Sequence, residues 1–224
     1  MLGRRGWNIT LTARGLSGLD CVAAELAELG VEARSVAGDV ADEAHTVRLL
    51  ADHLAAYGGV DALVLAAGVG WAAPIDGYPS KRLDLQLNVN FRSPFLLTSA
   101  ALPSMRASAK YHTQGVSRLI AISSIEGLNA EPGLAAYGAT KAALISLVDS
   151  VNSEERINGI VATAIAPGYV ATDMSDWVTE VIAKDTMLCV DDVVRCVELI
   201  FDLSPQAVLP RIVLQRRTAG SQRA

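Results

Sequence analysis

Two side chains that can cooperate in proton transfer stand four residues apart in the segment 122–144. Tyr137 and Lys141 have the spacing that puts two side chains on one face of a helix. An ammonium group beside a phenol favours the phenolate, so Lys141 is expected to lower the pKa of Tyr137 from its ordinary value of about 10. The pair predicts a general acid/base that acts near neutral pH. The alternative is an aromatic core residue followed by a solvated lysine.

Two polar residues favour the chemical interpretation by their positions. Ser124 lies at the end of a predicted strand, 13 residues before Tyr137, and Asn90 lies in the segment NVNFRSPFLL. Ser123 is an alternative to Ser124, because neighbouring strand residues face opposite ways. Asn88 is likewise an alternative to Asn90.

Short β-rich runs alternate with longer helical patterns, and these elements must position the polar residues. This order is typical of an α/β fold with a doubly wound, Rossmann-like parallel sheet. We expect a single domain over residues 1–224 with a flexible tail from about 215, and residues 1–7 are typical of the last turn of a helix. The predicted strands are 8–13, 32–37, 62–66, 118–123, 159–165 and 208–214, and the predicted helices are 19–29, 42–57, 80–106, 136–156 and 191–203.

In such sheets ligands bind beyond the carboxyl ends of the strands. There the sequence resembles the short-chain dehydrogenase/reductase family, in which Asn, Ser, Tyr and Lys form a catalytic tetrad that Asn90, Ser124, Tyr137 and Lys141 match. The resemblance implies hydride transfer between a nicotinamide and a carbonyl or alcohol carbon. It implies that Tyr137 passes the proton to or from the substrate oxygen and that Ser124 orients this oxygen by hydrogen bonding. It also implies that Lys141 holds the ribose hydroxyls and that Asn90 holds a water in the proton relay.

Segments that line the cofactor in this family also have counterparts here. They are GDV after the second strand, AAG after the third, and APGYVAT after the strand that follows Lys141. The resemblance implies that Asp39 meets the adenine end and Thr172 the nicotinamide end. A turn cap is the other interpretation of Asp39, and a plain strand-to-helix turn that of Pro167 and Gly168. The predicted cofactor-binding residues are Arg14, Asp39, Val40, Ala67, Gly68, Tyr137, Lys141, Pro167, Gly168, Val170 and Thr172.

The type of cofactor depends on Arg14. NAD-preferring relatives place an Asp at this point to bind the ribose 2′-hydroxyl, whereas an arginine suits a 2′-phosphate. The sequence therefore favours NADP over NAD, although an ordinary solvated loop arginine remains the alternative.

An apolar substrate pocket is expected beside the tetrad. The family places a mobile lid where residues 174–187 follow Thr172. The residues that would line the pocket, each of which could equally be a core or interface residue, are Trp71, Leu128, Tyr169 and Trp177.

One family element is missing. Relatives begin with a strand and a Gly-rich loop at a helix N-terminus, which binds the cofactor pyrophosphate, but no GxxxGxG segment precedes Trp7. We expect an N-terminally truncated fold with an unfilled strand position between 8–13 and 62–66. Two hypotheses follow. The sequence belongs to an NADP-dependent oxidoreductase and lacks about 25 to 30 of its N-terminal residues, or the chain is a catalytically impaired binding or interaction subunit.

The composition argues against several other classes of function. A net charge of −5 argues against nucleic-acid binding, and no apolar run reaches the roughly 20 residues that span a membrane. The three cysteines have no CxxC spacing, so we interpret them as small core residues of a protein in the reducing cytoplasm, and we predict no metal site.

The resemblance also implies a homodimer or homotetramer, because family relatives associate through the two long helices, here 80–106 and 136–156. The three histidines, His45, His53 and His112, are predicted at the surface, and Arg211, Arg216, Arg217 and Arg223 in a solvated tail.

Overall fold

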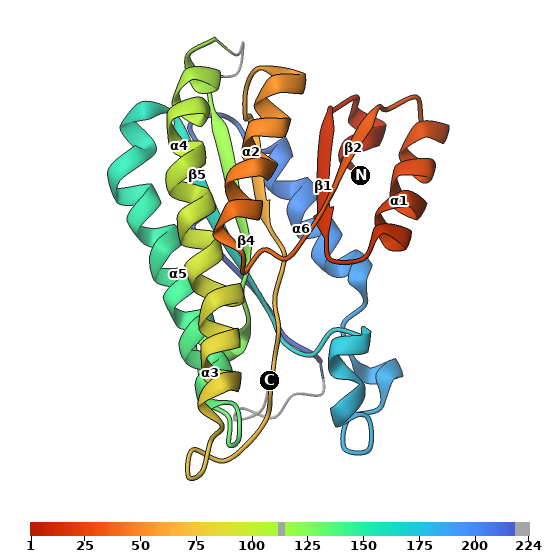
Figure 1. Cartoon of the computed structure of the whole chain (residues 1–224). Helices are drawn as coiled ribbons and strands as arrows, with labels where there is room; N and C mark the ends of the chain where they lie inside the picture. Colours follow the sequence, from red (N-terminus) through yellow and green to blue (C-terminus); the bar gives the residue numbers. More distant parts are fainter. Residues whose placement is uncertain (112–114, 218–224) are drawn as a thin grey trace.

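The computed structural model describes residues 1–111 and 115–217 (Figure 1). All six predicted strands form, and helices make the crossovers that parallel strands require. The strands are β1 (Ile9–Ala13), β2 (Ala33–Ala37), β3 (Ala62–Leu65), β4 (Ser117–Ile122), β5 (Ile160–Pro167) and β6 (Arg211–Leu214). The α-helices are α1 (Leu16–Glu28), α2 (Glu43–Tyr57), α3 (Ser80–Leu87), α4 (Ser93–Tyr111), α5 (Ala135–Glu155) and α6 (Val190–Asp202).

The helix predicted over 80–106 is not continuous. Helices α3 and α4 are joined by η2 (Asn88–Arg92), a π-helical turn. A π-turn has one more residue than an α-turn, so it changes which side chains face inward, and such turns are frequent at functional sites. The prediction of one regular helix is therefore wrong at this point, where Asn90 lies.

The chain begins in a helical turn, as predicted. The 3-10 helix η1 (Leu2–Arg5) ends at Gly6, whose φ of 76° lies in the left-handed region that glycine adopts at low cost. Arg5 forms an ion pair with Asp202 at the end of α6.

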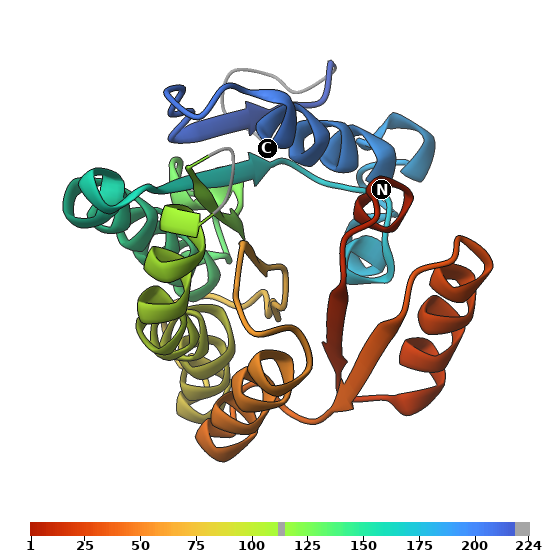
Figure 2. The ribbon, with the colours of Figure 1, turned by 90° about the horizontal axis from the view of Figure 1, so that it is seen from above.

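The strands form two parallel sheets rather than one. β1 pairs with β2, and β3, β4, β5 and β6 form a second sheet in that order. The sequence predicts an unfilled position between β1 and β3, and these two strands are indeed unpaired with each other. Seen from above, the β1–β2 pair and α1 lie apart from the larger sheet, across an interior space (Figure 2).

The main core lies between the larger sheet and the helices α4 and α5. Strands β4 and β5 are buried on both faces, as their apolar sequences predict. On one face Leu119 and Ala162 pack against Met105 and Leu144. On the other face Ile120 and Ile165 pack against Ile200 of α6.

The prediction of surface histidines is wrong for His45. This ring is 1% exposed, and its nitrogens bond Thr12 Oγ1 at 2.8 Å and Arg48 Nη2 at 3.0 Å. Burial, followed by the charge of Arg48, lowers its pKa. His53 is half-buried and bonds Thr10 Oγ1, while His112 lies outside the described residues.

The burial of the cysteines and the contacts of the C-terminal arginines also differ from the predictions. Cys21 and Cys189 are exposed and only Cys196 is half-buried. Cys189 directly precedes α6, as its N-cap residue. Arg211 pairs with Asp149 rather than lying in a solvated tail. The guanidinium of Arg216 lies 6.0 Å from the ring centroid of Tyr169. Most of the predicted tail, including Arg223, is outside the described residues.

Candidate active site

A cavity of about 290 Å³ opens where β3, β4 and β5 end. The loops that follow these strands form its walls, together with the first turns of α5 and α6. This is where ligands bind in open parallel sheets. Within the described part of the chain, no group of three His, Cys, Asp or Glu side chains could hold a metal ion, and no described helix is long and apolar enough to cross a membrane.

Tyr137 and Ser124 meet in this cavity through a hydrogen bond between their hydroxyl groups. Burial raises the pKa of Tyr137 to about 12, and the hydrogen bond from Ser124 opposes this increase. The expected lowering of the Tyr137 pKa by Lys141 is therefore absent in this structure. Tyr137 is therefore a neutral phenol near pH 7.

The ammonium group of Lys141 bonds the backbone of β4 and not the hydroxyl group of Tyr137. Its Nζ donates to the carbonyl oxygen of Ile122 at 2.9 Å and lies 5.7 Å from the ring centroid of Tyr137. The side chain is 4% exposed, and burial lowers its pKa to about 8. Lys141 is therefore held by the backbone of β4 rather than by the phenol oxygen.

The two adjacent serines face different partners. Ser123 Oγ donates to the carbonyl oxygen of Lys141 at 2.9 Å and so fixes α5 to β4. Ser124 Oγ accepts from the backbone N–H of Glu126 at 3.2 Å and faces Tyr137. Of the two, Ser124 has the hydroxyl beside Tyr137.

Asn90 is fully buried behind the cavity. Its Oδ1 accepts from the Val69 N–H at 2.8 Å, and its Nδ2 donates to the Val69 carbonyl at 2.8 Å and to Thr140 Oγ1 at 3.0 Å. Both amide hydrogens thus have protein partners, and the side chain ties the loop after β3 to α5. Asn88 is half-buried.

The predicted cofactor residues divide into two groups. Arg14 and Asp39 follow β1 and β2 and are exposed, and Asp39 Oδ1 accepts from the Ala41 N–H at 2.9 Å, which is the turn cap weighed as its alternative. Val40 and Ala67 border the space between β1 and β3. The residues that line the active-site cavity are Gly68, Tyr137, Lys141, Pro167, Gly168, Val170 and Thr172.

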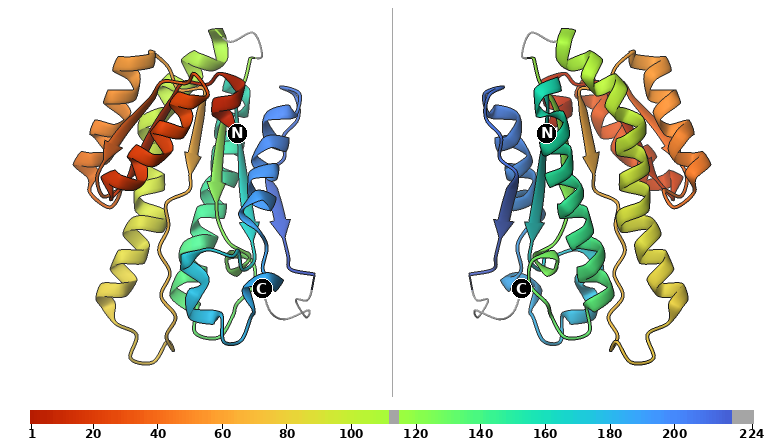
Figure 3. Two further views of the ribbon diagram at one scale, coloured as in Figure 1. Left: turned by 90° about the vertical axis from the view of Figure 1, so that its right-hand side faces the viewer. Right: turned by 90° about the vertical axis from the view of Figure 1, so that its left-hand side faces the viewer.

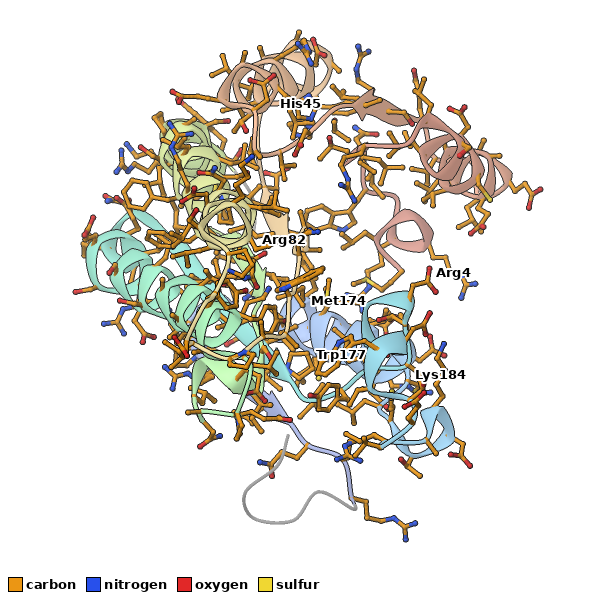
Figure 4. The ribbon with its side chains drawn as sticks, turned by 60° about the horizontal axis from the view of Figure 1, so that its bottom comes forward. Arg4, His45, Arg82, Met174, Trp177 and Lys184 are labelled. Atoms are coloured by element: carbon orange, nitrogen blue, oxygen red, sulfur yellow. The ribbon has the colours of Figure 1, made fainter. Side chains whose placement is uncertain are left out.

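Three of the four residues that were predicted to line an apolar substrate pocket lie in this cavity. Trp71, Tyr169 and Trp177 line the cavity, with the last two rings 6.1 Å apart, whereas Leu128 is not among the lining residues. The predicted lid contains two 3-10 helices, η5 (Asp173–Val178) and η6 (Lys184–Thr186). Figure 4 shows Met174 and Trp177 on the inner side of this segment and Lys184 on its outer side.

Two acidic residues of the site were not predicted from the sequence. Glu126 is 8% exposed and lines the cavity, and its carboxyl group is hydrogen-bonded to that of Glu131. Tyr169 donates to Glu131 Oε1 at 3.2 Å. Burial and the charge of Glu131 raise the pKa of Glu126 to about 8. A carboxylate two residues after Ser124 is the signal that could have indicated it.

This carboxyl pair makes stability depend on pH. Because the folded-state pKa of Glu126 is raised, its contribution is fully present below about pH 4 and is lost as the pH rises through about 8. We expect the melting temperature of the wild-type chain to fall between pH 5 and pH 9. Glu126→Gln should flatten this dependence, which thermal unfolding followed by circular dichroism would measure. Exposed Glu180 offers the control Glu180→Gln. Equal slopes of melting temperature against pH in all three proteins would contradict the raised pKa of Glu126.

Comparison with known proteins agrees with this geometry. A family model described as short chain dehydrogenase matches residues 1–182. The oxidoreductase YxjF of Bacillus subtilis is 29% identical over 203 residues, which cover 91% of this chain and 76% of YxjF. The 3-oxoacyl-acyl-carrier-protein reductase FabG of Staphylococcus aureus is 28% identical over 188 residues, which cover 84% of this chain and 74% of FabG.

Solved structures give the same result. A metagenomic short-chain oxidoreductase in complex with NADP aligns with a TM-score of 0.80 and 29% identity, covering 97% of this chain and 89% of the other. A gluconate 5-dehydrogenase from Burkholderia cenocepacia, in complex with NADP and tartrate, aligns with a TM-score of 0.81 and 25% identity, covering 96% and 85%. The fold, the cavity at the strand ends and the family match over residues 1–182 lead to one conclusion: the chain belongs to the short-chain dehydrogenase family.

Proposed function

We propose that this chain is an NADP-dependent oxidoreductase that transfers hydride between a nicotinamide and a carbonyl or alcohol carbon. The observation that carries the proposal is the meeting of Tyr137, Ser124 and Lys141 in one cavity at the ends of the parallel strands. Two similar solved structures are complexes with NADP, which supports the choice of cofactor.

The residues around the cavity fit the nicotinamide end of such a cofactor. A Cβ atom on Gly68 would lie 3.3 Å from Lys141 Nζ, a tight contact, and 3.6 Å from Asn90 Oδ1, so the loop after β3 passes close to the buried lysine. Lys141, Gly168 and Thr172 would hold this end, and Arg14 and Asp39 the adenine end. When bound, NADP would supply or accept the hydride.

The protein's own residues would handle the proton. Since Tyr137 is protonated near pH 7, it donates its phenol proton to the substrate oxygen as a carbonyl is reduced. Ser124 orients that oxygen by hydrogen bonding. Lys141, whose pKa burial lowers to about 8, can gain or lose a proton near the working pH; its Nζ lies 5.7 Å from the ring centroid of Tyr137, and it would hold the ribose of the cofactor.

The choice of cofactor can be tested at Arg14. A charge-assisted hydrogen bond contributes about 1.5–3 kcal/mol, so Arg14→Asp should weaken NADPH binding by about 10-fold to 100-fold and improve binding of NADH. Fluorescence titration of both cofactors measures this ratio. Exposed Lys110, at the far end of α4, gives the control Lys110→Asp. An unchanged ratio in Arg14→Asp would show that this arginine is a solvated loop residue.

The activity itself is tested by incubating the purified chain with NADPH and a series of ketones. We expect NADPH consumption with formation of the matching alcohol. The second candidate function is an interaction subunit without catalysis, and the unpaired edges of β1 and β3 favour it. That function predicts no turnover with any ketone in the series.

We also propose that the chain forms a homodimer or homotetramer through α4 and α5, which lie side by side on one outer face (Figure 3). Phe95 on α4 is 49% exposed. The three free cysteines suit a reducing compartment such as the cytoplasm. The mass of the assembly by light scattering tests the oligomer, and a monomer would contradict it.

A further inference from the structure

The loop after β3 carries one large aromatic side chain to the active-site cavity. Trp71 lines this cavity, and 41% of its surface is exposed. Apolar surface of this size is normally buried, and where it stays open inside a cavity it marks a surface that a ligand covers. The contacts that hold Trp71 indicate which ligand it fits.

The backbone of Trp71 is fixed on both sides. Its N–H donates to Gln86 Oε1 at 3.2 Å, and its carbonyl oxygen accepts from the Tyr78 hydroxyl at 3.1 Å. Gln86 is 1% exposed and donates to the same hydroxyl at 2.6 Å, so the three residues form one network. Two residues further on, the Ala73 N–H donates to the Gly133 carbonyl at 2.9 Å. The loop therefore holds Trp71 at a defined place beside the cavity.

The indole ring of Trp71 is held as well. The guanidinium carbon of Arg82, on α3, lies 3.9 Å from the centroid of this ring, which is the geometry of a cation–π contact. A cation so close to the centroid covers one face of the ring and leaves the other face open. Because Arg82 already orders the ring, little side-chain entropy is lost when a ligand packs on the open face.

Trp71 also follows directly on a residue that contacts Tyr137. A Cβ atom built on Gly70 would lie 3.6 Å from Cδ2 of the Tyr137 ring, which is an ordinary van der Waals distance. The loop therefore packs against Tyr137 one residue before Trp71. When a carbonyl oxygen bonds the Tyr137 hydroxyl, the group attached to the carbonyl carbon has the indole ring within reach.

The ionisable groups of the cavity already have protein partners. Among the described residues that line it, Glu126 and Lys141 are the acidic and basic ones. The Glu126 carboxyl bonds a second carboxyl group, and Lys141 Nζ donates to the Ile122 carbonyl at 2.9 Å. The rings of Tyr169 and Trp177 line the cavity from the segment after β5. These walls suit a neutral, flat and apolar group.

We propose that Trp71 is a specificity-determining residue, whose open indole face stacks on an aromatic ring bonded directly to the carbonyl carbon of the substrate. The inference rests on the proposed oxidoreductase function and names its substrate class, which is neutral aryl ketones and the matching secondary alcohols. Stacked aromatic rings attract each other beyond the area that they bury, so the site distinguishes an aromatic ring from an aliphatic ring of similar size. Arg82 is a positioning residue, which acts through the indole ring.

Three methyl ketones of equal carbon number test the substrate class: acetophenone, cyclohexyl methyl ketone and 2-octanone. Since they differ in intrinsic reactivity, the ratio of kcat/KM for acetophenone to that for each aliphatic ketone is compared between variants. Trp71→Leu should lower this ratio by about 2-fold to 10-fold, through KM, and Trp71→Phe, which keeps a ring, should retain most of it. Tyr111→Leu, at an aromatic position that is 88% exposed at the end of α4, should leave it unchanged.

The role of Arg82 is tested separately. Arg82→Met should raise the KM for acetophenone by about 2-fold to 5-fold and leave kcat for cyclohexyl methyl ketone unchanged, because the indole ring loses the cation that orders it. Lys81→Met, at the neighbouring exposed position of α3, is the matched control and should have no effect. A lower KM for acetophenone with a carboxylate on its ring, lost in Arg82→Met, would make Arg82 an anion-binding residue and overturn the proposal.

A binding experiment separates this proposal from the proposed activity. The chain has three tryptophans, and the indole N–H signal of Trp71 is the one that Trp71→Leu removes from the nitrogen-15 NMR spectrum. We expect acetophenone to shift this signal in a saturable way, and more strongly than cyclohexyl methyl ketone, because a stacked ring adds its ring current. The signal of Trp7, which is not among the residues lining the active-site cavity, should not move.

The outcomes of the two tests are distinguishable. An unmoved Trp71 signal, equal shifts with acetophenone and cyclohexyl methyl ketone, or an unchanged kcat/KM ratio in Trp71→Leu would overturn the role of Trp71. Saturable shifts of the Trp71 signal without oxidation of NADPH by any ketone would support that role and contradict only the oxidoreductase function.

Discussion

Tyr137→Phe is expected to lower kcat for ketone reduction by about 10²-fold to 10⁴-fold, the contribution typical of a positioned general acid. The substitution removes only the phenol oxygen beside Ser124, which is the proton donor in the proposed reaction. Because burial raises the Tyr137 pKa, loss of this donor by ionisation should not reduce the rate of reduction at any pH below about 11. Steady-state NADPH oxidation measures both effects.

The matched control for this substitution is Tyr111→Phe, at the exposed end of α4. Its kcat should equal that of the wild-type chain. Ser124→Ala should reduce kcat as well, and the double variant Ser124→Ala/Tyr137→Phe should lose little more than Tyr137→Phe alone, since hydrogen-bonded groups act together. Activity retained in Tyr137→Phe would assign the proton transfer to another group.

Asn152→Ala is expected to destabilise the fold by about 2–5 kcal/mol. The Asn152 side chain donates to the Ala162 carbonyl at 2.8 Å and accepts from the Ala162 N–H at 2.9 Å. Ala162 is fully buried, and β6 pairs with β5 only from Ala164 onward, so the amide replaces a missing strand partner. Each unpaired buried group costs about 1–3 kcal/mol.

For a domain of this size the loss corresponds to a melting temperature lower by about 5–15 °C. Thermal unfolding by calorimetry measures it. Ser150→Ala, on the same helix, removes only an exposed hydroxyl that bonds the Ser146 carbonyl, and should change the melting temperature by less than about 2 °C. Equal effects of the two substitutions would contradict the role of Asn152 as a backbone partner.

The elements of the fold could be predicted because local patterns specify them. The apolar runs of β4 and β5 are buried on both faces, and Gly6 ends the first helical turn as expected. The break of 80–106 at Asn88–Arg92 was not predictable, because a single π-turn shifts the inward-facing positions by only one residue, which is hard to recognise within so long a helical pattern. The His45 ring is buried and bonds Thr12 of β1, 33 residues away, and no local pattern reveals such a contact.

The candidate site could likewise be predicted only in part. The spacing of Tyr137 and Lys141, and the position of Ser124 at a strand end, predicted which side chains meet in one cavity. The pKa of Tyr137 was predicted in the wrong direction, because it depends on burial and on where Lys141 Nζ points. The Glu126 and Glu131 pair was missed for a similar reason: the loop that brings the carboxyl groups together has no regular spacing.

The measurement that most directly tests the oxidoreductase function follows the hydride. The purified chain is incubated with NADPH deuterated at the transferable position of the nicotinamide and a ketone, and the product is analysed by mass spectrometry. Our account predicts one deuterium on the carbinol carbon of the alcohol product, and none when Tyr137→Phe replaces the wild-type chain over the same time. Binding of NADPH without transfer of deuterium to any carbonyl compound in the series would contradict it, and would leave a family member that binds without catalysing.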